Sequence, residues 1–244
     1  MLEVPKVGPR LEAASRVRIS LCLLTWNEID GCRHDVPKLP INAFDQVYAV
    51  DGGSTDGTVE YLQSMGIAVH RQPVRGYNQA YRHAFSQCTS DFLVLFHPKG
   101  TIDPQHTLKF REPFENGCDL VIGSRNIAGA RNEEDDLWLR PRKWFVIGLS
   151  LLAALIWKRK GLIAWDVLHG FRGMRKDKFE AIEPLQAGLS VDLEMVVRSY
   201  RKGFKLIEFP TQERERLAGE THFKAFRTGK QLLAYLVAEI QRKA

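Results

Sequence analysis

The chain has 244 residues, of which 44% are hydrophobic, 26% charged and 10% aromatic. This composition excludes a disordered or fibrous chain and fits a single α/β core with a C-terminal extension. The formal net charge of +6 suits an anionic partner without choosing among nucleotide diphosphates, anionic lipids and nucleic acids. The cysteines are scattered with no CxxC pair, which indicates reduced thiols of a cytoplasmic protein rather than a disulfide or zinc framework.

Two segments bear on membranes. Residues 1–16 contain no apolar stretch typical of a secretory signal, so we expect a loose N-terminal arm. The longest apolar run, 144–157, is shorter than the ~20 residues that a membrane-spanning helix needs. Tryptophan stands at each of its ends with basic clusters beyond, a pattern typical of a helix in the lipid headgroup layer. We therefore expect an interfacial helix at 141–158, with a buried core helix as the alternative.

Short β-rich runs alternate with helical segments through the first half of the chain. Strands are predicted at 17–24, 46–50, 67–70, 91–96 and 119–122, and helices at 58–65, 77–87 and 103–116. No hairpin turn follows the first two strands, so we expect a doubly wound, mostly parallel twisted sheet with helices on both faces. Beyond about residue 126 the alternation loosens. The later elements are the apolar helix, a segment around 170–172, a helix at 191–201, a strand at 205–210 and an amphipathic helix from 225.

Polar clusters follow four of the predicted strands. They are Thr25-Trp26-Asn27-Glu28, Asp51-Gly52-Gly53-Ser54-Thr55-Asp56, His97-Pro98-Lys99-Gly100 and Gly123-Ser124-Arg125. Ligands of open parallel sheets bind beyond the carboxyl ends of the strands, so these clusters should converge. Asp51 leaves a hydrophobic strand just before two glycines, where its carboxylate could accept hydrogen bonds from a base or ribose. The alternative is that Asp51 and Ser54 cap the next helix.

A series of motifs resembles one known family. The run VDGGSTDGT at 50–58, preceded by TWNE at 25–28, resembles the nucleotide-binding half of family 2 glycosyltransferases, which have the GT-A fold. The later motifs are similar in order and spacing to those of dolichyl- and polyprenyl-phosphate sugar synthases. They are VIGSR (121–125), GFRGMR (170–175), SVDLEM (190–195) and R-x-x-G-x-T-H-F (216–223). The resemblance implies a Rossmann-like GT-A fold, with a nucleotide-sugar-binding half at 17–126 and an acceptor-side half at 127–244.

Carried over by position, the resemblance implies a donor site in the first half. Its residues would be Thr25, Trp26, Asn27, Glu28, Asp51, Gly53, Ser54, Asp56, His97 and Lys99. In the family pattern, however, an Asp-x-Asp pair that binds a divalent ion stands where this chain has His97, Pro98 and Lys99. Mg²⁺ prefers oxygen ligands, so the Mg or Mn cofactor expected from the family is poorly provided for here. Either the Lys99 charge replaces the ion at the diphosphate, or the chain is a non-catalytic relative.

The resemblance also implies residues on the acceptor side. Arg125 would bind the donor or acceptor phosphate, and Arg216 the lipid phosphate or the leaving diphosphate, because guanidinium groups match phosphate oxygens. For Arg216 a solvated charge is the alternative. Asp166 is the best-placed general base if the acceptor is a hydroxyl, although it could equally cap the local backbone. The remaining acceptor residues are Arg172 and His222, the latter in place of a lysine of the family pattern.

These observations favour an inverting hexosyltransferase. We expect a GDP- or UDP-linked sugar as donor and a polyprenyl-phosphate-like or other membrane-associated acceptor, with the protein cytoplasmic and peripheral on the membrane. The competing interpretation is a glycosyltransferase-like binding or regulatory protein without turnover. We expect no nucleic-acid partner, since the basic residues are dispersed and form no recognition motif.

Overall fold

The computed structural model describes residues 16–136, 138–217 and 225–242. Its centre is a seven-stranded sheet with the order β3-β2-β1-β4-β6-β5-β7. Neighbouring strands run parallel except β6, which is antiparallel to both β4 and β5. The strands are β1 (Ile19–Thr25), β2 (Gln46–Asp51), β3 (Ala68–Arg71), β4 (Phe92–Phe96), β5 (Leu120–Ser124), β6 (Arg172–Arg175) and β7 (Leu206–Pro210). The predicted mostly parallel α/β fold is confirmed.

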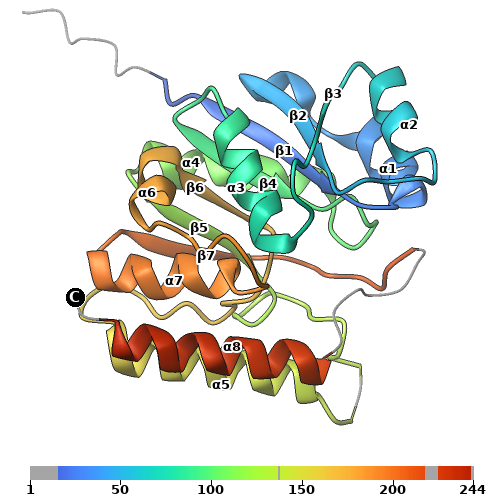
Figure 1. The fold of residues 1–244 in the computed structure, drawn as a ribbon. Coiled ribbons are helices and arrows are strands. Elements are labelled where there is room, and N and C mark those ends of the chain that lie inside the picture. The colour runs from blue at the N-terminus through green and yellow to red at the C-terminus, as the bar shows by residue number, and fades with distance from the viewer. Residues whose placement is uncertain (1–15, 137, 218–224, 243–244) are drawn as a thin grey trace, which may run out of the picture.

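Helices cover both faces of the sheet because side chains of the central strands alternate between two cores. On β1, Cys22 and Leu24 belong to one core and Leu21 and Leu23 to the other. The first face carries α3 (Tyr77–Gln87), α6 (Lys176–Ala181) and α7 (Val191–Lys202) (Figure 1). The second carries α1 (Ile29–Asp35), α2 (Thr58–Ser64), α4 (Arg111–Glu115) and the 3₁₀ segments η1 (Val36–Lys38), η2 (Ile41–Ala43) and η3 (Pro104–Phe110).

Two long helices form a further layer outside α7 (Figure 1). They are α5 (Pro141–Trp157) and α8 (Ala225–Gln241), the predicted C-terminal helical extension. α5 buries Val146, Leu149 and Ala153, and a Cβ on Gly229 of α8 would lie 3.5 Å from the Phe145 ring of α5. In the described part of the chain, neither these nor any other helix combines the length and apolarity needed to cross a bilayer.

Two expected elements differ from the structure. The prediction of one helix at 103–116 was wrong: η3 is followed by the separate α4. Pro113 explains the break, because it lacks the N–H that a continuous α-helix would bond to Lys109. The segment around 170–172 was not predicted as a strand, yet β6 pairs on both edges, with Leu95 and Ile122 each opposite Arg172.

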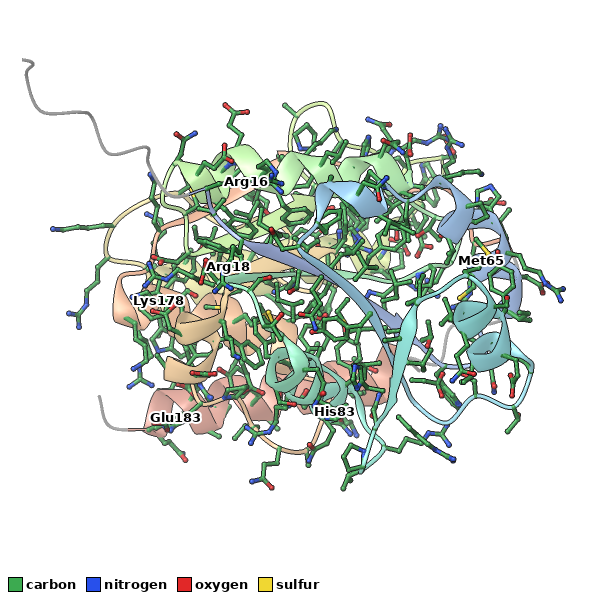
Figure 2. The ribbon with its side chains drawn as sticks, turned by 90° about the horizontal axis from the view of Figure 1, so that it is seen from above. Arg16, Arg18, Met65, His83, Lys178 and Glu183 are labelled. Carbon is green, nitrogen blue, oxygen red and sulfur yellow. The ribbon has the colours of Figure 1, made fainter. Side chains whose placement is uncertain are left out.

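The parallel strands place the four polar clusters at one edge of the sheet. The opposite end is marked in Figure 2 by Arg18, before β1, and Lys178 of α6. Asp91 lies at this end too: it pairs with Arg18 at 3.0 Å, and its carbonyl accepts a backbone bond from Lys176, the first residue of α6, at 2.8 Å. A hollow of about 400 Å³ lies at the amino ends of β2 and β3, lined by residues that include Gln46 and Ile67. It is therefore remote from the polar clusters.

Candidate active site

The loop after β2 is organised by the carboxylate of Asp51. One oxygen accepts from the backbone N–H groups of Gly53 and Ser54, both at 2.8 Å. The other accepts from the hydroxyls of Ser54 at 2.5 Å and Thr25 at 3.1 Å. Gly53 takes the left-handed φ of 92° that glycine adopts without strain. Asp51 is only 1% exposed, so it shapes the loop and does not cap α2, which was the alternative from the sequence.

Asp56 and Asn27 join the loops after β1 and β2. Asp56 accepts from the backbone N–H of Thr58 and of Ile29, the first residues of α2 and α1, both at 3.0 Å, and so satisfies a free donor at the start of each helix. Asn27 donates its N–H to Ser54 Oγ at 2.8 Å and accepts from the Thr55 N–H at 2.9 Å. These bonds fix the two loops as one rigid platform.

Trp26 and two arginines face the same platform. The guanidinium carbon of Arg75 lies 3.7 Å from the centroid of the Trp26 ring, a cation–π geometry. A Cβ on Gly52 would lie 3.2 Å from the Trp26 Cβ, and one on Gly53 would lie 3.6 Å from a terminal nitrogen of Arg71. The platform thus combines a flat aromatic ring with two cations, which suits a base and phosphates of a nucleotide.

The loop after β4 packs directly on α1. A Cβ on Gly31 would lie 2.0 Å from the Pro98 carbonyl oxygen and 2.9 Å from the Lys99 Cα, so only glycine permits this approach. The N–H of Gly100 donates to the buried carboxylate of Asp35 at 2.8 Å. Burial raises the pKa of Asp35, and hydrogen bonds from His34 and Gly100 offset part of that shift. The backbone of this loop is therefore held in one position.

Charged side chains surround His97 and Lys99, and Arg216 acts on both. The His97 ring stacks with Tyr77 at 6.4 Å between centroids, and a Cβ on Gly170 would lie 2.7 Å from its Cε1. Burial, and then the neighbouring Lys99 charge, lower the pKa of His97 well below its ordinary value, so the imidazole is neutral at pH 7. Burial also lowers the pKa of Lys99, and nearby Glu28 offsets this only in part.

The residues present do not fit a divalent ion. Mg²⁺ and Mn²⁺ favour carboxylate oxygens, whereas this loop offers a neutral imidazole and an ammonium. Glu28 and Glu213, the carboxylates that act on Lys99, are paired with Arg216 and Arg125. Over the ranges that the structure describes, no three His, Cys, Asp or Glu side chains are grouped so as to hold a metal ion.

Arg125 and Asp166 form a buried ion pair at the end of β5. Asp166, 0% exposed, accepts from the Arg125 backbone N–H at 2.9 Å, from Nε at 2.8 Å and from Nη2 at 2.9 Å. Arg125 also donates from Nη1 to Glu213 at 3.2 Å. Burial raises the pKa of Asp166, but the Arg125 charge and hydrogen bonds outweigh it and lower the pKa overall. Both carboxylate oxygens of Asp166 are thus bonded to Arg125, and the lowered pKa of Asp166 makes it a weak base.

Arg172 lies beneath the site. Its side chain is fully buried, and Nε lies 3.0 Å from the carboxylate of Asp192. Asp192 also accepts from the hydroxyls of Tyr77 at 2.6 Å and Tyr81 at 2.8 Å. The guanidinium further donates to backbone carbonyls, among them that of His169 at 2.7 Å. The Arg172 side chain is fully buried and does not line the neighbouring cavity, so it is not placed to contact an acceptor, contrary to the expectation from the sequence. Arg172 instead positions Asp192.

Arg216 belongs to the segment 211–217, which crosses the loop after β4. Arg214 N–H donates to the Thr101 carbonyl at 2.8 Å, and Leu217 N–H to that of Lys99 at 3.4 Å. The Arg216 guanidinium forms an ion pair with Glu28 at the amino end of α1. Arg216 is thus partly buried and paired, which excludes the alternative of a freely solvated charge. His222 lies outside the described residues.

A cavity of about 710 Å³ opens between α5 and α8 and ends at the site. Its inner end is polar and includes Tyr77, Arg125 and Asp192. Its length is mainly apolar, lined by Phe145, Val146, Leu168, Leu189, Leu232 and Leu233. Basic and acidic side chains, Glu133, Arg142, Lys143 and Lys230, also line it. Such a shape suits a long apolar ligand with an anionic head.

Several of these side chains were not singled out from the sequence. Tyr77 and Tyr81 are one helical turn apart, a spacing that could have indicated a shared partner. Glu213 lies in a run of alternating charges that gave no sign of burial, and Arg75 stands in a loop. Their roles depend on contacts between distant segments, such as Arg125 with Glu213, 88 residues apart.

The order of the strands, the polar loops at one edge of the sheet and the adjoining cavity together define an α/β enzyme architecture of the GT-A type. Residues 21–183 match the family described as Glycosyl transferase family 2, more than half of the chain. The chain therefore belongs to glycosyl transferase family 2 and is a glycosyltransferase. A catalytically inactive relative is accordingly not favoured.

Curated relatives extend the match beyond that range. The chain is 28% identical over 225 residues to the undecaprenyl-phosphate mannosyltransferase of Micrococcus luteus, covering 84% of this chain and 87% of that protein. It is 30% identical over 185 residues to a dolichyl-phosphate hexose transferase of Haloferax volcanii, covering 75% and 76%. With the dolichol-phosphate mannosyltransferase of Pyrococcus furiosus it shares 25% identity over 229 residues, 90% of this chain but 62% of that protein.

Solved structures share the fold. Glucosyl-3-phosphoglycerate synthase from Mycobacterium tuberculosis, in complex with Mn²⁺ and UDP-glucose, superposes with a TM-score of 0.71 at 17% identity. The match covers 93% of this chain and 80% of that one. At this identity the likeness supports the GT-A fold alone.

Proposed function

We propose that the chain transfers a hexose from a GDP- or UDP-linked sugar to a polyprenyl phosphate, with inversion at the anomeric carbon. The observation that carries this proposal is the cavity between α5 and α8, which is lined mainly by apolar side chains and includes Arg125 in its lining. A polyprenyl chain would fill the apolar part, and its phosphate would reach the guanidinium. The names of the Micrococcus and Pyrococcus relatives, both polyprenyl-type phosphate mannosyltransferases, support the same acceptor class.

Arg125 is suited to an anionic head group. Its Nε, Nη1 and Nη2 each donate one bond to Asp166 or Glu213. Since each terminal nitrogen carries a second N–H, two donors remain for phosphate oxygens. The two carboxylates hold the guanidinium plane in place, so little side-chain freedom is lost when the phosphate binds.

The state of Asp166 also favours a phosphate over a hydroxyl acceptor. A hydroxyl needs a general base with a pKa near the working pH. Asp166 has a lowered pKa, and both its oxygens accept from Arg125. A phosphate is already anionic and can attack the anomeric carbon without proton removal. In this proposal Asp166 positions Arg125 and takes no proton.

The donor would bind on the platform formed by the loops after β1 and β2. Trp26 offers a surface for stacking, and Arg71 and Arg75 bring positive charge beside it. The sugar would lie over the loop after β4, between the platform and the inner end of the cavity. This arrangement brings the anomeric carbon toward Arg125, where the acceptor phosphate arrives.

The outer layer would rest on an anionic bilayer. On α5 the exposed side chains Trp144, Leu151, Leu152, Leu155 and Ile156 recur at helical spacing, and Leu233, Val237 and Ile240 do so on α8. Leu155 is 84% exposed. The basic side chains at the amino end of α5 are paired with acidic residues of the preceding loop, as in Arg142 with Glu133 at 3.0 Å. Attraction to anionic lipid therefore rests on Lys158, Arg159 and Lys160 after α5.

A transfer assay in detergent tests the acceptor cavity. Purified protein is given a panel of labelled GDP- and UDP-hexoses with a short-chain polyprenyl phosphate, and the lipid product is extracted. Leu233→Glu, which places a charge in the cavity, should raise the KM for the acceptor by on the order of 10-fold or more. Val237→Glu, one turn further along α8 and outside the cavity lining, is the matched control. Equal effects of the two variants would remove the cavity from the proposal.

Flotation with phosphatidylglycerol vesicles tests the membrane face. Leu155→Glu should reduce the bound fraction strongly, because it introduces a charge into the apolar stripe. Leu108→Glu, with 42% exposure on η3 at the opposite face, should leave binding unchanged. Equal flotation of the Leu155→Glu variant and the unmodified chain would contradict membrane attachment through α5.

A further inference from the structure

The loop after β4 has a cation where the family pattern has metal-binding carboxylates. We propose that Lys99 and Arg216 neutralise the donor diphosphate directly, so that the nucleotide sugar binds without a divalent ion. This inference rests on the proposed nucleotide-sugar donor and adds the chemistry by which its charge is balanced. It sets this chain apart from fold neighbours such as the synthase solved with Mn²⁺ and UDP-glucose.

The side chains at the loop after β4 offer poor ligands for a metal ion. His97 is a neutral imidazole engaged with Tyr77, and Pro98 carries no polar side chain. Glu28 and Glu213 are the carboxylates that act electrostatically on Lys99, and both are already paired with arginines. A hard divalent cation placed here would lack oxygen ligands and would face the positive charge of Lys99.

The second support is the fixed position of Lys99. The Pro98 carbonyl abuts Gly31 of α1, where a Cβ would come within 2.0 Å. The Lys99 carbonyl accepts from Leu217 at 3.4 Å, and the next N–H donates to Asp35 at 2.8 Å. Contacts from α1 and from 211–217 therefore hold the Lys99 backbone in place before a ligand arrives. The fixed backbone limits the positions that the Lys99 ammonium can reach, and a cation already present at the site stabilises negative charge that develops on a leaving diphosphate.

The third support is the charge around Lys99. Within the part of the chain that the structure describes, the Lys99 ammonium forms no ion pair within 4.0 Å. Burial lowers its pKa, and the positive charges of Arg216 and Arg125 act in the same direction. A partly buried ammonium under these conditions gains free energy from an incoming anion. A diphosphate supplies that anion.

Arg216 would complete the site by exchanging partners. Its guanidinium pairs with Glu28, whose carboxylate lies at the amino end of α1. A diphosphate entering beside Lys99 would compete for the same guanidinium, leaving Glu28 free for a nucleoside hydroxyl. Because 211–217 also touches the loop after β4, this exchange would couple donor binding to the position of that segment.

Calorimetric titration with UDP and GDP tests the inference, first in EDTA and then in Mn²⁺. The expected result is binding in EDTA with an affinity that Mn²⁺ changes by less than about threefold. Lys99→Ala should weaken binding on the order of 10- to 100-fold, the usual effect of losing a charge-assisted hydrogen bond. The matched control is Lys109→Ala on η3, which should bind as the unmodified chain does.

A gain-of-function variant keeps the test decisive if Lys99→Ala folds poorly. The double variant His97→Asp/Lys99→Asp introduces a carboxylate pair at this loop and should bind the nucleotides only when Mn²⁺ is present. Mn²⁺-dependent binding by the unmodified chain would overturn the inference and leave the proposed transfer intact. Metal-free nucleotide binding without sugar transfer would support the inference and contradict the proposed transfer. No nucleotide binding with or without Mn²⁺ would overturn the inference and the proposed transfer together.

Discussion

Replacing Asp166 by asparagine separates a positioning role from that of a base. The substitution removes the negative charge of a fully buried carboxylate that accepts three hydrogen bonds from Arg125. Asn can retain one oxygen for the backbone N–H and Nε, but its amide would then face the Nη2 donor. Breaking a buried ion pair costs about 3–5 kcal/mol, and Glu213 still pairs with Arg125 at 3.2 Å. We therefore expect the free energy of unfolding to fall by about 3 kcal/mol.

Urea unfolding followed by circular dichroism measures that loss, with Asp177→Asn as control because its pair with Arg175 is exposed. The control should lose about 0–1 kcal/mol. In the transfer assay, Asp166→Asn should raise the KM for polyprenyl phosphate without removing an acidic limb from the pH profile of kcat. A loss of stability below about 1 kcal/mol, or a kcat that no longer depends on pH where it did before, would refute the positioning role.

Three further predictions follow from the packing. Gly31→Ala should weaken UDP or GDP binding on the order of 10- to 100-fold, because its Cβ would displace the Pro98 carbonyl and shift Lys99; titration calorimetry measures this. Nucleotide binding should weaken as pH rises, beginning below the ordinary lysine range since the pKa of Lys99 is lowered, and Lys99→Ala should lack this limb in the same titrations. Asp192→Ala should lower the free energy of unfolding by about 3–5 kcal/mol in urea, because the buried Arg172 would lose its counter-charge. Unchanged affinity, a pH-independent affinity and unchanged stability are the respective contrary results.

Much of the fold could be predicted because its signals are local. The strand at 91–96 is a run of consecutive apolar residues, and the helix Tyr77–Gln87 was predicted with the bounds that the structure has. β6 could not be predicted in this way. It has only four residues and includes Arg172, which is buried only because Asp192 of another element supplies its counter-charge. A polar side chain whose partner lies far along the chain gives no periodic signal.

The candidate site shows the same limit. The loop around Asp51 was predictable because most of its partners lie within three residues. The pairs Arg125 with Asp166 and Arg216 with Glu28 join residues 41 and 188 positions apart. Each arginine was expected to meet phosphate, and neither local sequence revealed that a carboxylate already holds it. The cavity between α5 and α8 likewise depends on how two amphipathic helices pack.

The most direct test of the account is the lipid product of the purified chain. Protein, a panel of GDP- and UDP-hexoses and polyprenyl phosphate are incubated with EDTA, and the extracted lipid is examined by mass spectrometry and anomeric NMR. We predict a polyprenyl-phosphate hexose of inverted configuration in the reaction with EDTA. A parallel reaction with Mn²⁺ should form the same product at a similar rate. The product should be absent when the dephosphorylated polyprenol replaces polyprenyl phosphate. Transfer to the polyprenol, or no lipid-linked hexose from any donor with or without Mn²⁺, would contradict the proposed function.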